Sequence, residues 1–237
     1  AKLAADPRLL AYFPIHPDTT TKRRIPDTSA ADNHATLVRT DRVPDRWGRP
    51  GAALDFTPTG SRARLTVPGT HSALTLACWI KIDSLDRWYN SLFLTDGHEL
   101  NEPHWQIMDD GRLFFSVKKY ATATADHSDK HIFYSPSFWS PDLSGKWLHI
   151  ATVYDTAAKT VTHYLNGEPL SIERIPEKYL VDTIQIGPAS IGNWSEPKRD
   201  APHFAVRNLN GSIDEFALFD TALDRTEITG LYKAGKP

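Results

Sequence analysis

The segment that most constrains the fold lies near the end of the chain, from Gly211 to Tyr232, and reads GSIDEFALFDTALDRTEITGLY. Alternation of its side chains predicts a β-strand over residues 211–219 with both faces largely apolar. Such a strand is typical of a sheet that is covered on both sides. Asp224, with Glu227 three residues later, has capping-box spacing and predicts a short helix after the turn.

The same alternation separates the acidic residues of this strand. It places Asp214 and Asp220 on one face, with Phe216 and Leu218 between them, and Glu215 on the other face. Glycoside hydrolysis requires two carboxylates that face each other across the scissile bond, and the strand pattern E-x-D-x-x-E, which would place two on one face, is absent here. We therefore predict that the protein is not an enzyme, and glycoside hydrolysis is the less favoured alternative.

Hairpin signals divide the middle of the chain. Asp110-Gly111 and Asn166-Gly167 each join two strand-like runs, as two-residue primed turns do. The fold class that we predict is all-β, a single domain over residues 1–237. We expect strands near residues 9–14, 52–57, 63–67, 74–83, 91–95, 104–109, 112–118, 147–154, 160–165, 183–187 and 211–219.

Composition excludes some partners. The 27 basic and 29 acidic residues give a net charge of −2, which argues against a nucleic-acid surface. No apolar run approaches the ~18 residues of a membrane span, so we expect no direct membrane insertion by this module. The single cysteine, Cys78, lies in the apolar run LTLACWIKI and is predicted to be a buried thiol.

Motifs along nearly the whole chain follow one another in the order of a known family. They are LLAYF at 9–13, DTSAADNHATL at 27–37, GAALDF at 51–56, LTLACWIKI at 74–82, KWLHIATVYD at 146–155, YLNGEP at 164–169 and the segment 211–232. On these motifs the chain resembles the LamG-like jelly rolls of the concanavalin A-like lectin/glucanase superfamily. The resemblance implies a two-sheet antiparallel β-sandwich with a short C-terminal helical turn. It also implies a module of a larger bacterial protein, periplasmic, extracellular or at the cell surface, in some relatives following a FecR-like segment.

The resemblance further suggests a structural calcium ion, held in this chain by Asp27, Asn33 and Asp214. Calcium takes six to eight oxygen ligands, and the loop DTSAADN is rich in side-chain oxygens. The family's glycines in this loop are replaced here by Ala30 and Ala31. An Asx turn, in which Asp27 bonds nearby amides, is the alternative.

Aromatic residues beside polar or turn-forming neighbours are the candidate ligand-binding residues. Sugar rings stack on Trp and Tyr, while their hydroxyls bond polar side chains. The candidates are Trp88, Tyr89, Trp105, Tyr120, Trp139 and Trp194. All six lie in segments 85–105, 119–142 and 187–208, which we interpret as long functional loops. We predict a non-catalytic module that binds carbohydrate, with a glycan or cell-surface ligand; a protein-interaction or adhesion module is the alternative.

Overall fold

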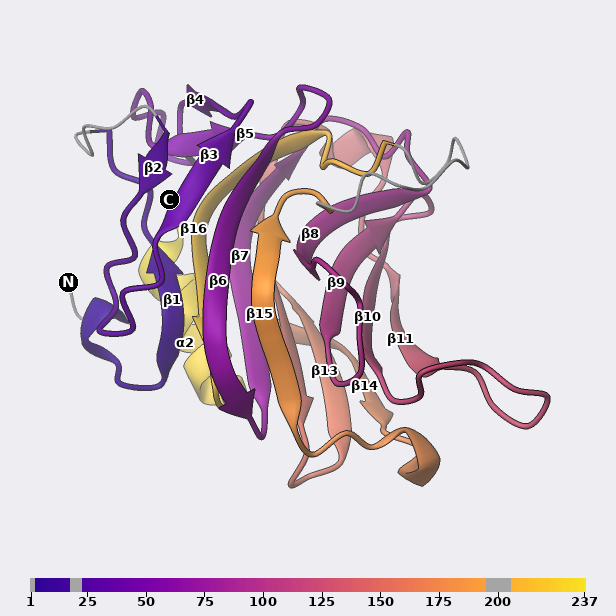
Figure 1. The fold of residues 1–237 in the computed structure, drawn as a ribbon. Helices are drawn as coiled ribbons and strands as arrows, with labels where there is room; N and C mark the ends of the chain where they lie inside the picture. Colours follow the sequence, from indigo (N-terminus) through magenta and orange to yellow (C-terminus); the bar gives the residue numbers. More distant parts are fainter. Residues whose placement is uncertain (1–2, 18–22, 195–205) are drawn as a thin grey trace.

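The protein is a sandwich of two antiparallel sheets in a computed structural model that describes residues 3–17, 23–194 and 206–237 (Figure 1). Sheet A has the order β14-β13-β12-β7-β16-β5-β4, and β1 also pairs with β16. Its strands are β1 (Leu9–Phe13), β4 (Asp41–Val43), β5 (Ala53–Asp55), β7 (Leu74–Ile82), β12 (Trp147–Asp155), β13 (Thr160–Leu165), β14 (Glu168–Arg174) and β16 (Gly211–Phe219).

Sheet B has the order β11-β10-β9-β8-β15-β6-β3-β2. Its strands are β2 (Arg24–Ile25), β3 (Ala35–Val38), β6 (Arg62–His71), β8 (Tyr89–Thr95), β9 (Pro103–Met108), β10 (Arg112–Lys118), β11 (Lys130–Ser137) and β15 (Ile184–Ile191). The described helices are α2 (Arg225–Gly235) and the 3-10 turns η1 (Leu3–Ala5), η2 (Pro141–Leu143) and η3 (Glu177–Tyr179). The predicted all-β sandwich is confirmed. Within the described residues, no helix is long and apolar enough to cross a membrane.

The main core lies between the sheets. Every second residue of β7, from Leu74 through Cys78 to Ile82, belongs to it, as period-two geometry requires. Phe93 and Phe216 stack across it with ring centroids 5.8 Å apart. Cys78 is 1% exposed, and burial raises the pKa of its thiol, so the predicted buried thiol is confirmed.

Helix α2 covers the outer face of sheet A and begins with the predicted capping box. Glu227 N donates to Asp224 Oδ1 at 2.8 Å, and Asp224 N donates to Glu227 Oε2 at 2.9 Å. Ile228 joins a second apolar cluster, and Tyr232 stacks on Trp79 with ring centroids 5.6 Å apart. In Figure 1 the helix lies behind β16, on the far side from sheet B.

Strand β16 does not alternate strictly. Its register with β7 shifts between Asp214 and Ala217, and Glu215 has a φ of 60°. This β-bulge inserts one residue, so that Ile213 and Phe216 both enter the main core while Ala217 faces the helix. Our assignment of Asp214 and Glu215 to opposite faces is therefore wrong, because the bulge brings both carboxylates to one guanidinium.

Segment 119–142 was predicted to be one long loop, and this prediction is wrong. It contains β11, which pairs antiparallel with β10 at the edge of sheet B, and then η2. Six of the eight residues of β11 are partly buried or exposed, and its sequence lacks the apolar alternation that marks an inner strand.

Gly211, at the start of β16, is needed because a Cβ there would collide with the carbonyl oxygen of Lys81.

Candidate functional site

The outer face of sheet B carries polar side chains that are almost completely buried. Trp105 and Ile107 of β9 point into the core, so His104 and Gln106 of the same strand point outward. These two outward residues are nevertheless only 4% and 1% exposed. The residues that flank segment 195–205, Trp194 and Arg207, pack against this face and cover it.

Arg207 is the centre of this arrangement. Its Nη2 donates to Gln106 Oε1 at 2.5 Å, and its carbonyl accepts from Ser91 N at 2.9 Å. Its guanidinium carbon lies 4.6 Å from the ring centroid of Tyr89 and 4.7 Å from that of Trp194. Cation–π contacts of this kind orient a guanidinium firmly, particularly where water is excluded.

Two histidines form one wall of the site. The rings of His98 and His104 stack with centroids 4.1 Å apart. His104 Nε2 lies 3.2 Å from the carbonyl oxygen of Thr95 and must donate its proton there, which leaves Nδ1 as an acceptor. Burial first, then the nearby His98 and Arg207, holds the pKa of His104 well below its usual range. His104 is therefore neutral at physiological pH.

Together these residues line a hollow of about 290 Å³, which we call the sheet B hollow. It is lined by Tyr89, Gly97, His98, His104, Gln106, Phe114, Lys118, Asp129, Lys130, Trp194 and Arg207. The ammonium of Lys130 pairs with Asp129 at 2.9 Å. The lining thus combines aromatic rings with donors and acceptors, which is the mixture that fixes a polar ring compound in a defined orientation.

Of the six predicted aromatic residues, two meet in this hollow. Tyr89 comes from β8, and Trp194 follows β15; its Nε1 donates to the carbonyl oxygens of Thr95 and Asp96 at 2.8 and 3.0 Å. Trp88 is 53% exposed and its ring centroid lies 6.4 Å from that of Tyr89, but it is not part of the lining.

The other three predicted residues lie elsewhere. Trp105 is 0% exposed in the core, so it has no surface to offer a ligand, and its assignment is corrected. Tyr120 donates its hydroxyl proton to the carbonyl oxygen of Lys178 at 2.8 Å. Trp139 packs against the core and lines a separate open depression with Leu85. Residues 195–205, which belong to the predicted 187–208 loop, lie outside the residues that the structure describes.

Sequence reasoning missed Arg207, Gln106 and Lys118. The signal for Gln106 was present, since a strand that buries Trp105 must turn both of its neighbours outward. No comparable signal marks Arg207, because its position depends on how a distant segment packs onto β8 and β9.

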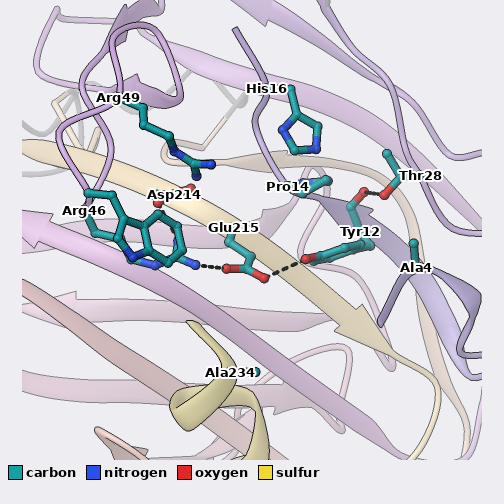
Figure 2. Close-up of a pocket in the computed structure, with 11 residues that line it drawn as sticks. Ala4, Tyr12, Pro14, His16, Thr28, Arg46, Arg49, Asp214, Glu215 and Ala234 are labelled. Carbon is teal, nitrogen blue, oxygen red and sulfur yellow. Dashed lines mark hydrogen bonds and ion pairs between the residues drawn. The ribbon is translucent and has the colours of Figure 1, made fainter. Parts of the chain in front are cut away.

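A second hollow, of about 450 Å³, opens beside β1 and β16 (Figure 2). Figure 2 shows Arg46 and Tyr12 approaching the carboxylate of Glu215 from opposite sides. Tyr12 donates its hydroxyl proton to Glu215 Oε1 at 2.6 Å, and Arg46 donates to both Glu215 and Asp214. Burial raises the pKa of Asp214 to about 6, although Arg46 acts in the opposite direction.

This pair of carboxylates is poorly arranged for acid–base catalysis. Asp214 lines this hollow, but its side chain is 3% exposed and is bound by a guanidinium that is 2% exposed, so it offers a substrate very little surface. Glu215 is 23% exposed, but its oxygens accept hydrogen bonds from Arg46 and Tyr12.

The residues expected to hold calcium do not fit that ion as they are arranged. The carboxylate of Asp27 accepts from the amides of Tyr12, Ser29 and Asn33 at 2.8–2.9 Å and from the Ser29 hydroxyl. This is the hydrogen-bonded turn that we considered as the alternative. Asp214 faces a positive charge, which would repel a cation. Over the part of the chain that the structure describes, no group of three or more His, Cys, Asp or Glu side chains is placed to hold a metal.

Comparison with solved structures confirms the jelly-roll fold. A botulinum neurotoxin serotype D ligand-binding domain, in complex with N-acetylneuraminic acid, superposes with a TM-score of 0.70 at 12% identity, over 98% of this chain and 52% of that one. A structure of botulinum neurotoxin type C, whose cell entry depends on interaction with two ganglioside molecules, gives 0.66 at 12% identity, over 99% and 53%. The binding domain of Paraclostridial Mosquitocidal Protein 1 gives 0.67 at 17% identity, over 96% and 52%.

The chain therefore spans about half the length of these structures, and at such low identity the likeness concerns the fold alone. No curated protein matches the chain in sequence. The family model described as the concanavalin A-like lectin/glucanases superfamily matches residues 59–229, which is well over half of the sequence. The chain belongs to the concanavalin A-like lectin/glucanases superfamily.

Proposed function

We propose that the protein is a non-catalytic ligand-binding module that binds carbohydrate in the sheet B hollow. The single observation that carries this proposal is the meeting of Tyr89, Trp194 and Arg207 over the buried polar face of β9. Buried polar side chains that face a hollow are costly for a fold unless they serve a ligand or a neighbour.

The chemistry of the lining suits a sugar. Gln106 and the neutral His104 offer acceptors, while Lys118, Lys130 and Arg207 are donors. The rings of Tyr89 and Phe114, with centroids 6.0 Å apart, supply apolar surface for C–H groups. A volume of about 290 Å³ is close to the lower end of the roughly 300–1,000 Å³ of small-molecule sites, which favours the end of a glycan over a long chain.

The lining also favours binding over hydrolysis. Glycoside hydrolysis normally uses two carboxylates across the scissile bond. Among the described residues that line the sheet B hollow, Asp129 is the one carboxylate, and it is paired with Lys130.

The superfamily and the similar structures are consistent with this function. Two of those structures are of toxins described with N-acetylneuraminic acid or gangliosides, but each is about twice the length of this chain. We extend the proposal to the setting that the family resemblance implies, a module of a larger exported or cell-surface bacterial protein. A general adhesion surface has less support. Among the residues that the structure describes, the large exposed apolar side chains are distributed over the β4–β5 loop (Trp47), the ends of β8 and β9 (Trp88, Leu100) and the edge strand β14 (Ile172).

A glycan array with a matched pair of variants tests the proposal. The wild-type protein should bind a subset of immobilised saccharides, and Tyr89→Ala should weaken binding by about tenfold or more, the equivalent of roughly 1.4 kcal/mol. Trp88→Ala removes the neighbouring aromatic ring from outside the hollow and should leave binding unchanged. A blank array with folded protein, or equal losses in both variants, would argue against a carbohydrate site here.

A further inference from the structure

Arg46 is a buried cation that joins three parts of the protein. It lies in the loop between β4 and β5, and its side chain is 2% exposed. It donates to the carboxylates of Asp214 and Glu215 in the bulge of β16. Its Nε also donates to the carbonyl oxygen of Gly235 at 2.6 Å, at the end of α2.

Aromatic rings and a rigid turn hold the guanidinium in place. Its carbon lies 3.7 Å from the ring centroid of Trp47 and 4.9 Å from that of Trp79. The turn is fixed by Asp45, which is 3% exposed and whose carboxylate accepts from the amides of Trp47 and Arg49 at 3.0 and 2.8 Å. A guanidinium presents its donors in one rigid plane, so it suits two carboxylates and a carbonyl better than an ammonium does.

The same network connects Asp27 and Asp214, the two carboxylates that the family resemblance implies would share calcium. Asp27 Oδ1 accepts from Tyr12 N at 2.8 Å, and the hydroxyl of Tyr12 donates to Glu215 at 2.6 Å. Glu215 and Asp214 are then bridged by Arg46. The backbone amide and the hydroxyl of Tyr12, with Glu215 and Arg46, thus connect Asp27 to Asp214.

We propose that the guanidinium of Arg46 takes the place of a divalent cation in tying the final strand to the β4–β5 loop and to α2. It pairs with the carboxylates of both Asp214 and Glu215 and satisfies the last carbonyl of the helix, which are tasks that a bound ion performs through oxygen ligands. The sandwich is therefore stable without calcium.

Thermal unfolding of the whole chain, with chelator and with millimolar calcium, tests this directly. The wild-type midpoint should be the same in both. Arg46→Met, which keeps an unbranched side chain but removes the charge, should lower the midpoint by roughly 6–20 °C, because it leaves two carboxylates without their partner. The control is Arg49→Met in the same turn. Arg49 is 56% exposed, pairs with Asp45 and lies 4.6 Å from the ring centroid of Trp47. Asp45 keeps its hydrogen bonds from the backbone amides of Trp47 and Arg49 in this variant, so the loss should cost at most about 4 °C.

A charge-neutral variant separates pairing from packing. Adding Asp214→Asn and Glu215→Gln to Arg46→Met removes the unpaired charges and should recover part of the lost midpoint, which a purely steric role of Arg46 would not allow. Should Arg46→Met not fold, Arg46→Lys keeps the charge but not the planar fork, and should melt below the wild type with no response to calcium. A wild-type midpoint that falls on chelation, or an Arg46→Met loss no larger than that of Arg49→Met, would overturn the proposal.

Discussion

Stability of this protein should fall steeply on mild acidification, because three histidines are buried in their neutral form. His104, His149 and His163 are 4%, 3% and 1% exposed. Burial lowers the pKa of His149 to about 3 and that of His163 to about 4, and it holds the pKa of His104 well below its usual range. Unfolding exposes all three to water, where their pKa is near 6.5.

The direction and size of the effect follow from proton uptake. Below about pH 6.5 the unfolded histidines bind protons that the folded ones do not. The stability that depends on keeping these histidines neutral is therefore complete above that pH and is lost as the pH falls. Asp214 acts in the opposite direction: burial raises its pKa to about 6, so the folded state holds a proton that the unfolded state releases. On unfolding near pH 5, His149 and His163 take up about two protons and Asp214 releases about one, which lowers the free energy of unfolding by about 1.4 kcal/mol per pH unit. His104 acts in the same direction as the other two histidines and makes the loss larger.

Urea unfolding curves at several pH values between about 4.5 and 6.5 measure this slope. His163→Gln should flatten it by about 1.4 kcal/mol per pH unit, one proton's worth, and Asp214→Asn should steepen it by about the same amount. Both variants also change the absolute stability. The difference in slope between each variant and the wild type, however, reports only the titrating group that was removed. A flat profile, or stability that rises as the pH is lowered through this range, would refute the assignment of these histidines as neutral and buried.

Two further predictions concern individual hydrogen bonds. Asp27→Ala removes the acceptor of four short hydrogen bonds, including the one from the buried amide of Tyr12. It should lower the free energy of unfolding by about 2–4 kcal/mol, both in chelator and in calcium. A loss seen only with calcium would show that Asp27 is a metal ligand. Asp224→Ala breaks the capping box of α2 and should cost about 1 kcal/mol in urea unfolding, whereas no loss would mean that packing against sheet A alone holds the helix.

Much of the fold could be predicted because local patterns and tertiary packing agree. Strand β7 alternates apolar residues into the core from Leu74 to Ile82, and the Asp224–Glu227 spacing marks the start of α2. The bulge at Glu215 could not be predicted, since one inserted residue leaves the apolar pattern of β16 almost unchanged. Strand β11 was missed because an edge strand has little to bury.

The candidate site was predicted only in part. Tyr89 and Trp194 were identified by their polar neighbours, and the same criterion misassigned Trp105, whose neighbours His104 and Gln106 are polar because they face the other side of the sheet. Arg207 reaches the hollow by a contact with Gln106, and the two are separated by 101 residues along the chain. A contact of that range depends on the assembled sandwich, and neither periodicity nor spacing along the chain indicates it.

The NMR signals of the tryptophan indole N–H groups test the location of the ligand site most directly. The chain has seven tryptophans, and each gives one indole signal that a Trp→Phe variant assigns. Trp194 lines the sheet B hollow, Trp47 lines the hollow beside Arg46, and Trp139 lines the depression beside Leu85. Titration with a saccharide that binds on the array should shift the Trp194 signal and leave those of Trp47 and Trp139 in place. A shift of Trp47 or Trp139 with Trp194 unmoved would place the ligand elsewhere and contradict the account.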